Sequence, residues 1–284
     1  MKVLVTGVTG QLGYDVAAEL ARRGRGIEHS GVGSKDMDLT DAKQVEEVVH
    51  AYHPDVIVHC AAYTAVDKAE DESDVCMAVN ADGTLAIAKA AKDIDAKMVY
   101  ISTDYVFGGE GNLPFEVDAE KFPVNIYGMT KLFGEQAVQM LLRKYFIIRI
   151  SWVFGKNGNN FIKTMLRLGK ERKKLNVVAD QWGSPTYTAD LALLICDMIE
   201  TEKYGVYHAT NEGVTCWADF AAVIFKEAEI SCEVHPIPTE AYPTRAQRPK
   251  NSRLSKKSLD AAGFHRLPDW RDALKRYLME IGEK

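Results

Sequence analysis

The hydrophobic and polar positions of this chain switch between two periodicities from its first residues onward. Short continuous apolar runs at residues 2–7, 55–61, 97–103 and 145–151 have the length expected of strands buried on both faces. Between them, apolar residues recur at helical spacing, which predicts helices over residues 11–23, 41–52 and 75–94 and another around residues 126–135. This alternation predicts an α/β fold, a doubly wound, Rossmann-like parallel sheet with helices on both faces.

The pattern loosens after about residue 150. A Gly/Asn-rich stretch, GKNGNN, is followed by the Pro-containing WGSPTY, and five of the nine prolines lie between residues 236 and 268. We expect a dinucleotide-binding Rossmann domain over residues 1–151 and, mainly from residues 152–284, a smaller C-terminal substrate-binding lobe. Strands near 175–180 and 205–211 are expected to rejoin the sheet. A cleft between the two parts would be the natural ligand site.

Composition narrows the class of protein. With 46% hydrophobic and 26% charged residues, the 284-residue chain is typical of a soluble globular protein. Its apolar stretches fall short of the roughly 20 residues that a membrane helix needs, so no membrane partner is expected. The start, MKVLVTG, enters a strand-like run without a secretory signal. These features predict a cytoplasmic protein.

Charge and cysteine usage argue against three further classes of protein. The five cysteines are odd in number, widely spaced and never in a C-x-x-C arrangement, so neither a disulfide framework nor a zinc site is indicated. The net charge of −5 gives no general attraction to nucleic acid. Residues 244–257 nevertheless hold six basic residues and no acidic one.

The strongest binding motif is the glycine turn VLVTGVTGQLG. Gly7, Gly10 and Gly13 follow the first strand directly and open the first helix. Glycines at such a turn allow a pyrophosphate to approach backbone N–H groups, and the helix N-terminus adds partial positive charge. The turn therefore predicts a nicotinamide dinucleotide site.

A candidate catalytic pair lies in IYGMTKLFGE, where Tyr127 and Lys131 stand four residues apart and share one face of a helix. A nearby ammonium favours the phenolate, so Lys131 should lower the pKa of Tyr127 toward neutrality. The hydroxyl of Thr103 or Ser102, at the end of the preceding strand, could polarise a carbonyl oxygen. Together these groups suit carbonyl reduction or its reverse, although the same pair could be an ordinary helix face.

The G-x-x-G-x-x-G turn and the Y-x-x-x-K pair resemble the extended short-chain dehydrogenase/reductase family. Five further segments, STDYVFGG, YGMTKLFGE, RISWVFG, DQWGSPTYTADLA and RPKNSRL, resemble its dTDP-4-dehydrorhamnose reductase group along nearly the whole chain. The resemblance implies NAD(P)H-dependent reduction of the 4-keto group of dTDP-4-dehydro-L-rhamnose to dTDP-L-rhamnose, a step of nucleotide-sugar synthesis for cell-surface polysaccharide.

The resemblance also implies roles for individual residues. The implied catalytic residues are Thr103, Tyr127 and Lys131. Besides the glycines and this Tyr–Lys pair, the expected cofactor contacts are Gln11, Leu12, Asp38, Leu39, Ala61, Ala62, Tyr63 and Thr64. The implied substrate contacts are Thr103, Asp104 and Trp152. Because a guanidinium suits a pyrophosphate, Arg248 in the basic segment is a further candidate for the substrate.

Coenzyme choice depends on the end of the second strand, within IEHSGVGSKDMDLTD. An acidic residue there normally accepts hydrogen bonds from the ribose hydroxyls of NADH. Our alignment places Gly33 at that position, followed by Ser34 and Lys35, which could accommodate a 2′-phosphate. We therefore expect NADPH to be used at least as well as NADH, unless Asp36 or Glu28 takes the acidic position.

Three questions stay open at this level. The chain could be a non-catalytic regulatory subunit, since the methionine adenosyltransferase β subunit is similar to this family, or an NDP-sugar epimerase or dehydratase. A dehydratase would be expected to carry an Asp-Glu pair where Asp104 is followed by Tyr105. Some relatives bind Mg²⁺ at a dimer contact, but no metal ligand can be assigned here, and a homodimer is left open.

Overall fold

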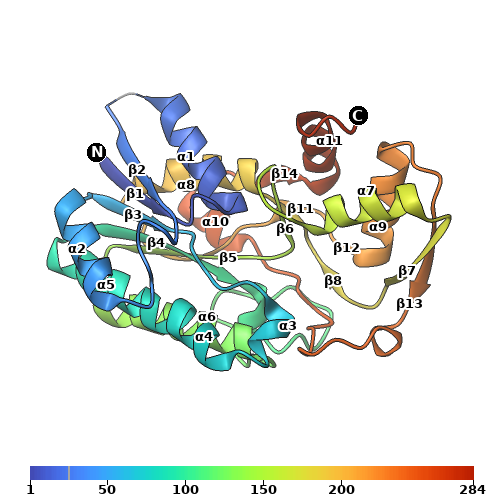
Figure 1. The fold of residues 1–284 in the computed structure, drawn as a ribbon, viewed down its shortest axis with the longest axis horizontal. Helices are drawn as coiled ribbons and strands as arrows, with labels where there is room; N and C mark the ends of the chain where they lie inside the picture. The colour runs from blue at the N-terminus through green and yellow to red at the C-terminus, as the bar shows by residue number, and fades with distance from the viewer. Residues whose placement is uncertain (25) are drawn as a thin grey trace.

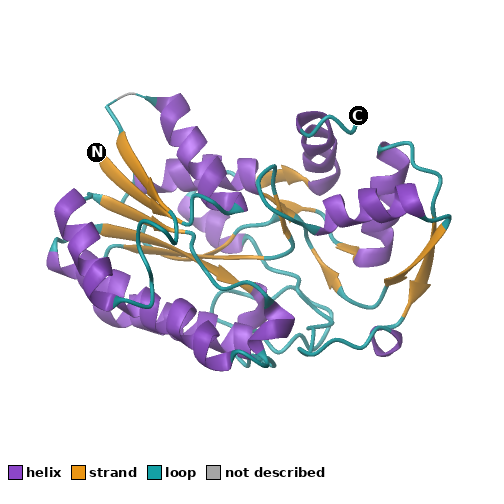
Figure 2. Cartoon of the chain, viewed as in Figure 1, coloured by secondary structure: helices purple, strands orange, loops and turns teal. Residues whose placement is uncertain are grey.

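The computed structural model describes residues 1–24 and 26–284. At its centre lies a six-stranded parallel sheet with the strand order β10-β5-β4-β3-β1-β2 (Figures 1 and 2). The strands are β1 (Lys2–Thr6), β2 (Glu28–Val32), β3 (Val56–His59), β4 (Lys97–Thr103), β5 (Tyr145–Ile150) and β10 (Gly205–His208). The expected doubly wound fold is confirmed.

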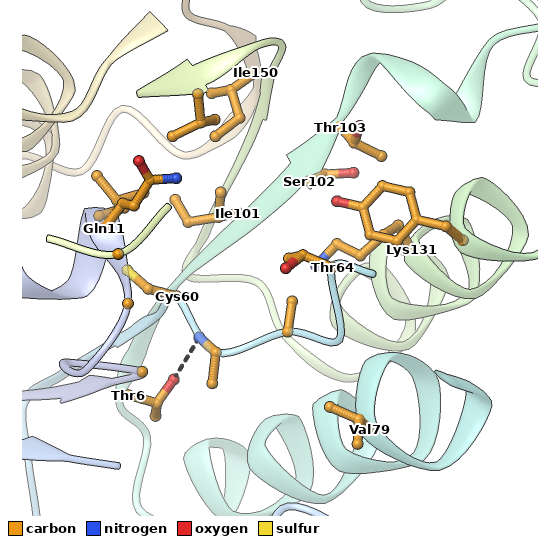
Figure 3. Close-up of a pocket in the computed structure, with 18 of the residues that line it drawn as sticks. Thr6, Gln11, Cys60, Thr64, Val79, Ile101, Ser102, Thr103, Lys131 and Ile150 are labelled. Atoms are coloured by element: carbon orange, nitrogen blue, oxygen red, sulfur yellow. Dashed lines mark hydrogen bonds between the residues drawn. The ribbon is translucent and has the colours of Figure 1, made fainter. Parts of the chain in front are cut away.

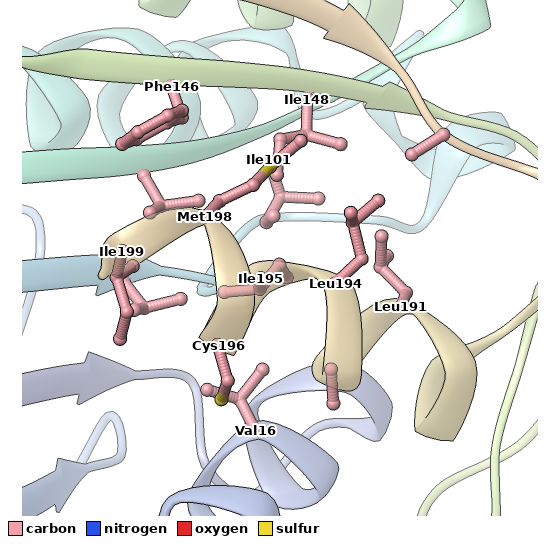
Figure 4. Close-up of a cluster of buried hydrophobic side chains, with 14 of the residues drawn as sticks. Val16, Ile101, Phe146, Ile148, Leu191, Leu194, Ile195, Cys196, Met198 and Ile199 are labelled. Carbon is pink, nitrogen blue, oxygen red and sulfur yellow. The ribbon is translucent and has the colours of Figure 1, made fainter. Parts of the chain in front are cut away.

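Helices cover both faces of this sheet and bury two apolar cores against it. On one face lie α1 (Gln11–Arg23) and α8 (Thr188–Ile199), and on the other lie α2 (Ala42–Tyr52), α5 (Gly83–Asp93) and α6 (Ile126–Leu141). Figure 4 shows the apolar side of α8, with Leu194, Ile195 and Met198 between the sheet and α1. Because α8 comes from the second half of the chain, the dinucleotide-binding part is completed by residues well beyond 151.

The predicted helix over residues 75–94 is irregular. It consists of α4 (Ser73–Met77), a π-helical turn (Ala78–Asp82) and α5. In the π turn, the side-chain amide of Asn80 accepts a hydrogen bond from the Tyr63 backbone N–H at 2.8 Å and donates one to the Tyr63 carbonyl oxygen at 3.0 Å. Side-chain hydrogen bonding of this kind has no signature in hydrophobic periodicity, which predicts only one continuous helix.

A second lobe gathers around its own apolar core. It contains α7 (Phe161–Glu171), α9 (Trp217–Glu227), α11 (Trp270–Glu280) and a two-stranded parallel sheet of β7 (Lys174–Val178) and β13 (Glu233–Ile237). The strand near 205–211 does rejoin the central sheet as β10, beside β5. The expectation that the strand near 175–180 also rejoins it is wrong, because β7 pairs with β13 and packs its buried side against α7 and α9.

Short elements connect the two parts. The remaining strands are β6 (Val153–Phe154), β8 (Trp182–Gly183), β9 (Thr186–Tyr187), β11 (Asn211–Glu212), β12 (Thr215–Cys216) and β14 (Leu267–Asp269). The short helices are α3 (Val66–Ala69), α10 (Lys257–Ala262) and the 3₁₀ turns Asp104–Val106 and Thr239–Ala241. Throughout the residues described, the helices are too short or too polar to cross a membrane.

Candidate active site

One cavity of about 850 Å³ runs along the carboxyl ends of β1, β3, β4 and β5, where open α/β sheets bind their ligands. Its lining begins at the glycine turn and continues to the first turns of α6, to Trp152 just after β5 and to Trp217 of the second lobe. In Figure 3, Gln11 lies at one end of the pocket, and Ser102, Thr103 and Lys131 lie at the other. The cavity therefore joins the two groups of residues that the sequence indicated separately.

The glycine turn has the close backbone packing that a pyrophosphate site needs. Gly7 has φ +71°, and a Cβ there would lie 2.7 Å from the backbone nitrogen of Ala61. A Cβ on Gly13 would lie 2.4 Å from the Gly7 carbonyl oxygen, so Gly13 serves helix-to-strand packing behind the pocket. Among the described residues no side chain caps the start of α1 at Gly10, and the first residues of this helix line the cavity, so their N–H groups are available to a ligand. These residues fit a dinucleotide phosphate.

Most of the expected cofactor contacts line this cavity. Those that do are Gly7, Gly10, Gln11, Leu12, Ser34, Asp38, Leu39, Ala61, Ala62, Thr64, Tyr127 and Lys131. The Tyr63 side chain turns away instead, since its hydroxyl donates a hydrogen bond to Glu72 Oε2 at 2.5 Å. Lys35 is exposed and lies outside the lining.

β2 ends directly before the position at which an acidic residue would contact the ribose of NADH. Its last residue is Val32, so Gly33 occupies the position directly after the strand. Glu28 begins the strand, at the opposite end from the cavity, and the alternative that it takes the acidic position is wrong. The Asp36 carboxylate accepts a hydrogen bond from the Gly33 N–H at 2.8 Å and is thereby occupied within the loop.

Thr103, Tyr127 and Lys131 lie together at the far end of the cavity. Thr103 is the last residue of β4, and the other two occupy the first turns of α6, whose start is capped by Asn125 accepting a hydrogen bond from the Gly128 N–H. The Thr103 hydroxyl faces the Tyr127 phenol and opposes the rise of its pKa. The three side chains are thus close enough to act on one substrate group.

The two candidate hydroxyls, of Ser102 and Thr103, have different hydrogen-bond partners. Ser102 donates a hydrogen bond to Glu135 Oε1 at 2.5 Å and is committed to that carboxylate. Thr103 donates to Asp104 Oδ1 at 2.9 Å, on the cavity side of the strand end. The arrangement favours Thr103 over Ser102 as the group that meets a carbonyl oxygen.

Burial sets the protonation of the Tyr–Lys pair. It lowers the pKa of Lys131 to about 7, while Glu135 opposes the change, and the ammonium lies 4.2 Å from the centre of the Tyr100 ring. Burial also raises the pKa of Tyr127, and nearby Asp104 raises it further. The expectation that Lys131 lowers the phenol pKa is therefore wrong for the protein alone, because burial dominates. Tyr127 is a neutral phenol, the form that can donate a proton.

Asp104 is a buried carboxylic acid beside these groups. Burial raises its pKa to about 6, while hydrogen bonds from Ser252 and Thr103 oppose the rise. Its Oδ2 atom is buried and has no hydrogen-bond partner within the described chain. An unpaired acceptor in a ligand cavity suits a substrate hydroxyl.

Trp152 lines the cavity with one face of its indole covered. Its φ of +50° is unusual for a bulky residue, and its ring stacks on that of Trp217 with centroids 3.7 Å apart. A Cβ at Gly183 would come within 2.9 Å of the Trp152 ring, so this position has room only for glycine. Trp217 and Gly183 therefore hold the Trp152 ring at the wall of the cavity.

Arg248 lies outside the residues that line the cavity. Its Nη2 donates to Asp67 Oδ2 at 2.7 Å, while Nη1 is buried without a partner among the described residues. Other cations of the basic segment 244–257 are paired as well: Arg245 with Asp71, Lys250 with Asp180 and Glu240, and Lys257 with Glu116. Four of the six basic residues of this segment are thus paired, and Arg245 and Arg248 tie it to α3 and the residues just after that helix.

Sequence reasoning missed two parts of the site. Trp217, at the start of α9, has no motif that marks it. The loop over residues 155–160 closes over the glycine turn: Asn157 Nδ2 donates to the Thr9 carbonyl at 2.8 Å, and Gln11 Oε1 accepts from the Gly155 N–H at 2.9 Å. The Gly/Asn composition indicated a loop but not its partner.

No group of three or more His, Cys, Asp or Glu residues in the described parts of the chain is arranged to hold a metal ion. Magnesium accordingly stays unassigned.

Comparisons with known proteins extend this picture. A model of the RmlD substrate binding domain family matches residues 1–282. The dTDP-4-dehydrorhamnose reductase of Escherichia coli (strain K12) is 43% identical, over 99% of this chain and 98% of its own. A Bacillus anthracis dTDP-4-dehydrorhamnose reductase solved with NADP has a TM-score of 0.95 and 45% identity, covering 98% of this chain and 99% of that one. The structure of a dTDP-4-dehydrorhamnose reductase from Clostridium acetobutylicum has a TM-score of 0.96 and 40% identity, covering 99% of this chain and 100% of that one.

The fold and the cavity define an oxidoreductase of the short-chain dehydrogenase/reductase type, with a Rossmann-like sheet and a Tyr–Lys pair at the end of the dinucleotide site. The chain belongs to the RmlD substrate binding domain family. The resemblance to the dTDP-4-dehydrorhamnose reductases is confirmed.

Proposed function

We propose that this protein reduces the 4-keto group of dTDP-4-dehydro-L-rhamnose to give dTDP-L-rhamnose. The observation that carries the proposal is the single cavity that joins the glycine turn to Thr103, Tyr127 and Lys131. A phosphate-binding turn at one end and a proton donor at the other suit hydride transfer to a carbonyl. Two dTDP-4-dehydrorhamnose reductases that are similar to this chain over nearly their whole length support the choice of substrate.

In this proposal each residue at the far end has a separate task. A bound NADPH or NADH would supply the hydride. Tyr127 donates its phenolic proton to the carbonyl oxygen as negative charge develops there, and the Thr103 hydroxyl polarises the same oxygen. The Lys131 ammonium then stabilises the phenolate that remains. The high phenol pKa suits this direction, since the donor is protonated before the reaction begins.

The remaining assignments concern substrate and coenzyme. Asp104 would accept a hydrogen bond from a sugar hydroxyl, and Trp152 would bound the sugar. Arg248 lies near Tyr105 and has one buried nitrogen without a partner among the described residues, and it would contact the nucleotide pyrophosphate. Gly33 and Ser34, rather than an acidic residue, directly follow β2, which supports NADPH as at least an equal coenzyme.

The division into two parts is also our proposal. The dinucleotide-binding part would comprise residues 1–151 with α8 and β10, and the substrate lobe would comprise the other segments of residues 152–284. This differs from the sequence-based boundary only in where later elements return to the sheet.

A direct assay tests the function. The purified protein is mixed with dTDP-4-dehydro-L-rhamnose and either coenzyme, and the loss of reduced-nicotinamide absorbance is followed together with formation of dTDP-L-rhamnose. Turnover is expected. No turnover, together with a second protein that co-purifies in stoichiometric amount, would support the regulatory-subunit alternative instead.

A further inference from the structure

A buried ionic group lies directly beneath the catalytic end of the cavity. Arg149 on β5 and Glu135 on α6 form a two-pronged ion pair, with Nε–Oε1 and Nη2–Oε2 distances of 2.8 and 2.7 Å. Their side chains are only 1% and 2% exposed. A buried ion pair contributes little to stability compared with apolar residues of the same volume, so its presence calls for a different explanation.

The pair belongs to a polar row across three neighbouring strands. Ser102 on β4 pairs in register with Arg149 on β5, which pairs in register with His208 on β10. Ser102 donates to the Glu135 carboxylate, and Arg149 donates to His208 Nε2 at 3.2 Å. The row lies one residue before Thr103, so it forms the layer directly under the reacting groups.

Glu135 connects this row to the helix that carries the Tyr–Lys pair. On α6, Glu135 follows Lys131 by four residues and Tyr127 by eight, so the three side chains lie on one face, a turn apart. Through Ser102, the same carboxylate is fastened to the residue before Thr103. One side chain thus links the two elements that bring the catalytic groups together.

The carboxylate is also the only acidic side chain that raises the pKa of Lys131 among the described groups acting on it. The other titratable groups that face this ammonium are thiols, phenols and an imidazole that burial keeps neutral: His59, Cys60, Cys76, Tyr100 and Tyr127. Glu135 is the largest influence that opposes the effect of burial on the Lys131 pKa, ahead of the thiols of Cys60 and Cys76.

We propose that Glu135, held by Arg149 and Ser102, is a positioning residue for the Tyr127–Lys131 pair. It fixes α6 against the end of β4 and places a negative charge one turn below the Lys131 ammonium. This proposal rests on the reductase function for its consequence in turnover. Its electrostatic part concerns the protein without substrate.

Two variants test separately the negative charge of Glu135 and its link to β4. Glu135→Gln combined with Arg149→Met removes both charges without leaving one buried and unpaired, and the amide oxygen can still accept from Ser102. Ser102→Ala removes the link to β4 and keeps the charges. Asp190→Asn combined with Arg276→Met is the matched control, because this ion pair, at 2.7 Å, lies in contact with α11 rather than α6.

The first readout needs neither substrate nor coenzyme. Trace acetylation of each full-length protein over a pH series, with mass spectrometry of the Lys131 peptide, gives the apparent pKa of that lysine. In the Glu135→Gln/Arg149→Met protein we expect it to lie about one unit below that of wild type. Wild-type and control proteins should agree with each other. An unchanged value in the folded double variant would overturn the electrostatic part.

The second readout is the split between turnover and the Michaelis constant. Ser102→Ala is expected to lower kcat about tenfold, with the Michaelis constants for sugar and coenzyme unchanged, because only the alignment of Thr103 with α6 is disturbed. Wild-type kcat in this variant would overturn the positioning part. If the wild-type protein has no reductase activity, the proposed function fails, while the labelling result still decides whether Glu135 sustains the Lys131 charge.

Discussion

The indole of Trp152 lies face to face with that of Trp217, with ring planes 16° from parallel and centroids 3.7 Å apart. The first residue comes from the chain just after β5 and the second from the first position of α9. The contact therefore joins the end of the central sheet to the second lobe at the wall of the cavity.

Removing one member of this stack should impair placement of the sugar. We expect Trp217→Ala to raise the Michaelis constant for the nucleotide sugar about tenfold, because Trp152 loses the ring that supports its unusual backbone conformation. Near-ultraviolet circular dichroism should lose the signal of the coupled indoles. Trp182→Ala is the control, since that indole packs on Arg253 outside the cavity lining and should leave the constant unchanged.

The phenol of Tyr127 should be essential for turnover. Tyr127→Phe keeps the ring and removes the proton donor, so we expect kcat to fall by about two to four orders of magnitude with coenzyme still bound. Coenzyme binding is checked by fluorescence titration. Tyr105→Phe is the matched control: its ring lies 5.7 Å from that of Tyr127, and it should retain most of kcat. Retention of more than about a tenth of kcat in Tyr127→Phe would refute the role.

Arg248 and Arg245 offer a paired test of pyrophosphate binding. Each forms an ion pair with an aspartate near α3, but only Arg248 has a buried nitrogen without a partner. Arg248→Ala is expected to raise the Michaelis constant for the nucleotide sugar more than it lowers kcat, because the pyrophosphate is remote from the reacting carbonyl. Arg245→Ala should do neither. Equal behaviour of the two variants at low salt would remove Arg248 from the substrate site.

Coenzyme preference can be measured directly. With Gly33 at the end of β2 and Asp36 engaged by the Gly33 N–H, we expect kcat/KM for NADPH to equal or exceed that for NADH. Lys35→Ala should weaken NADPH alone, because an exposed ammonium can reach a 2′-phosphate but has no counterpart on NADH. A preference of about tenfold or more for NADH, unaltered in Lys35→Ala, would contradict this assignment.

Two buried histidines predict a loss of stability in mild acid. Burial lowers the pKa of both His59 and His208 to about 3, below the ordinary value of 6.5. In mild acid these histidines therefore bind protons in the unfolded chain but not in the folded one. The stability that the neutral, buried histidines contribute is complete above pH 6.5 and falls as the pH drops toward 3. Urea unfolding at about pH 7 and pH 5 should show a loss of about 2 kcal/mol per histidine. His59→Gln should make the loss about 2 kcal/mol smaller than in the wild-type protein, since the contributions of other groups cancel in that comparison.

Hydrophobic periodicity predicted the fold well where burial alone decides structure. Val56, Ile57 and Val58 are fully buried on both faces of β3, and such a run has few alternatives to a central parallel strand. It failed at β7, whose apolar positions resemble those of a central strand but pair with β13, nearly sixty residues later in the chain. The identity of a strand's neighbour depends on contacts that no local pattern contains.

The site was predictable to the extent that its chemistry lies in short motifs. The glycine turn and the Tyr–Lys spacing placed Gly7, Tyr127 and Lys131 correctly in one cavity. The direction of the Tyr127 pKa could not be predicted, because it depends on how deeply the phenol is buried. The ion pair between Arg248 and Asp67 could not be predicted either, since those residues are 181 positions apart in the sequence.

The position of β10 in the chain bears on how the protein folds as it is made. The edge of β5 has no strand beside it until residues 205–208 have left the ribosome, and α8, which covers one face of the sheet, precedes β10 by only a few residues. A nascent chain holding five strands would expose an apolar sheet face until α8 emerges and an open edge until β10 emerges, and both are prone to association with other chains. Truncation shortly before residue 205 should therefore yield an aggregating product that chaperones retain, whereas the full sequence closes that edge with its own later segment.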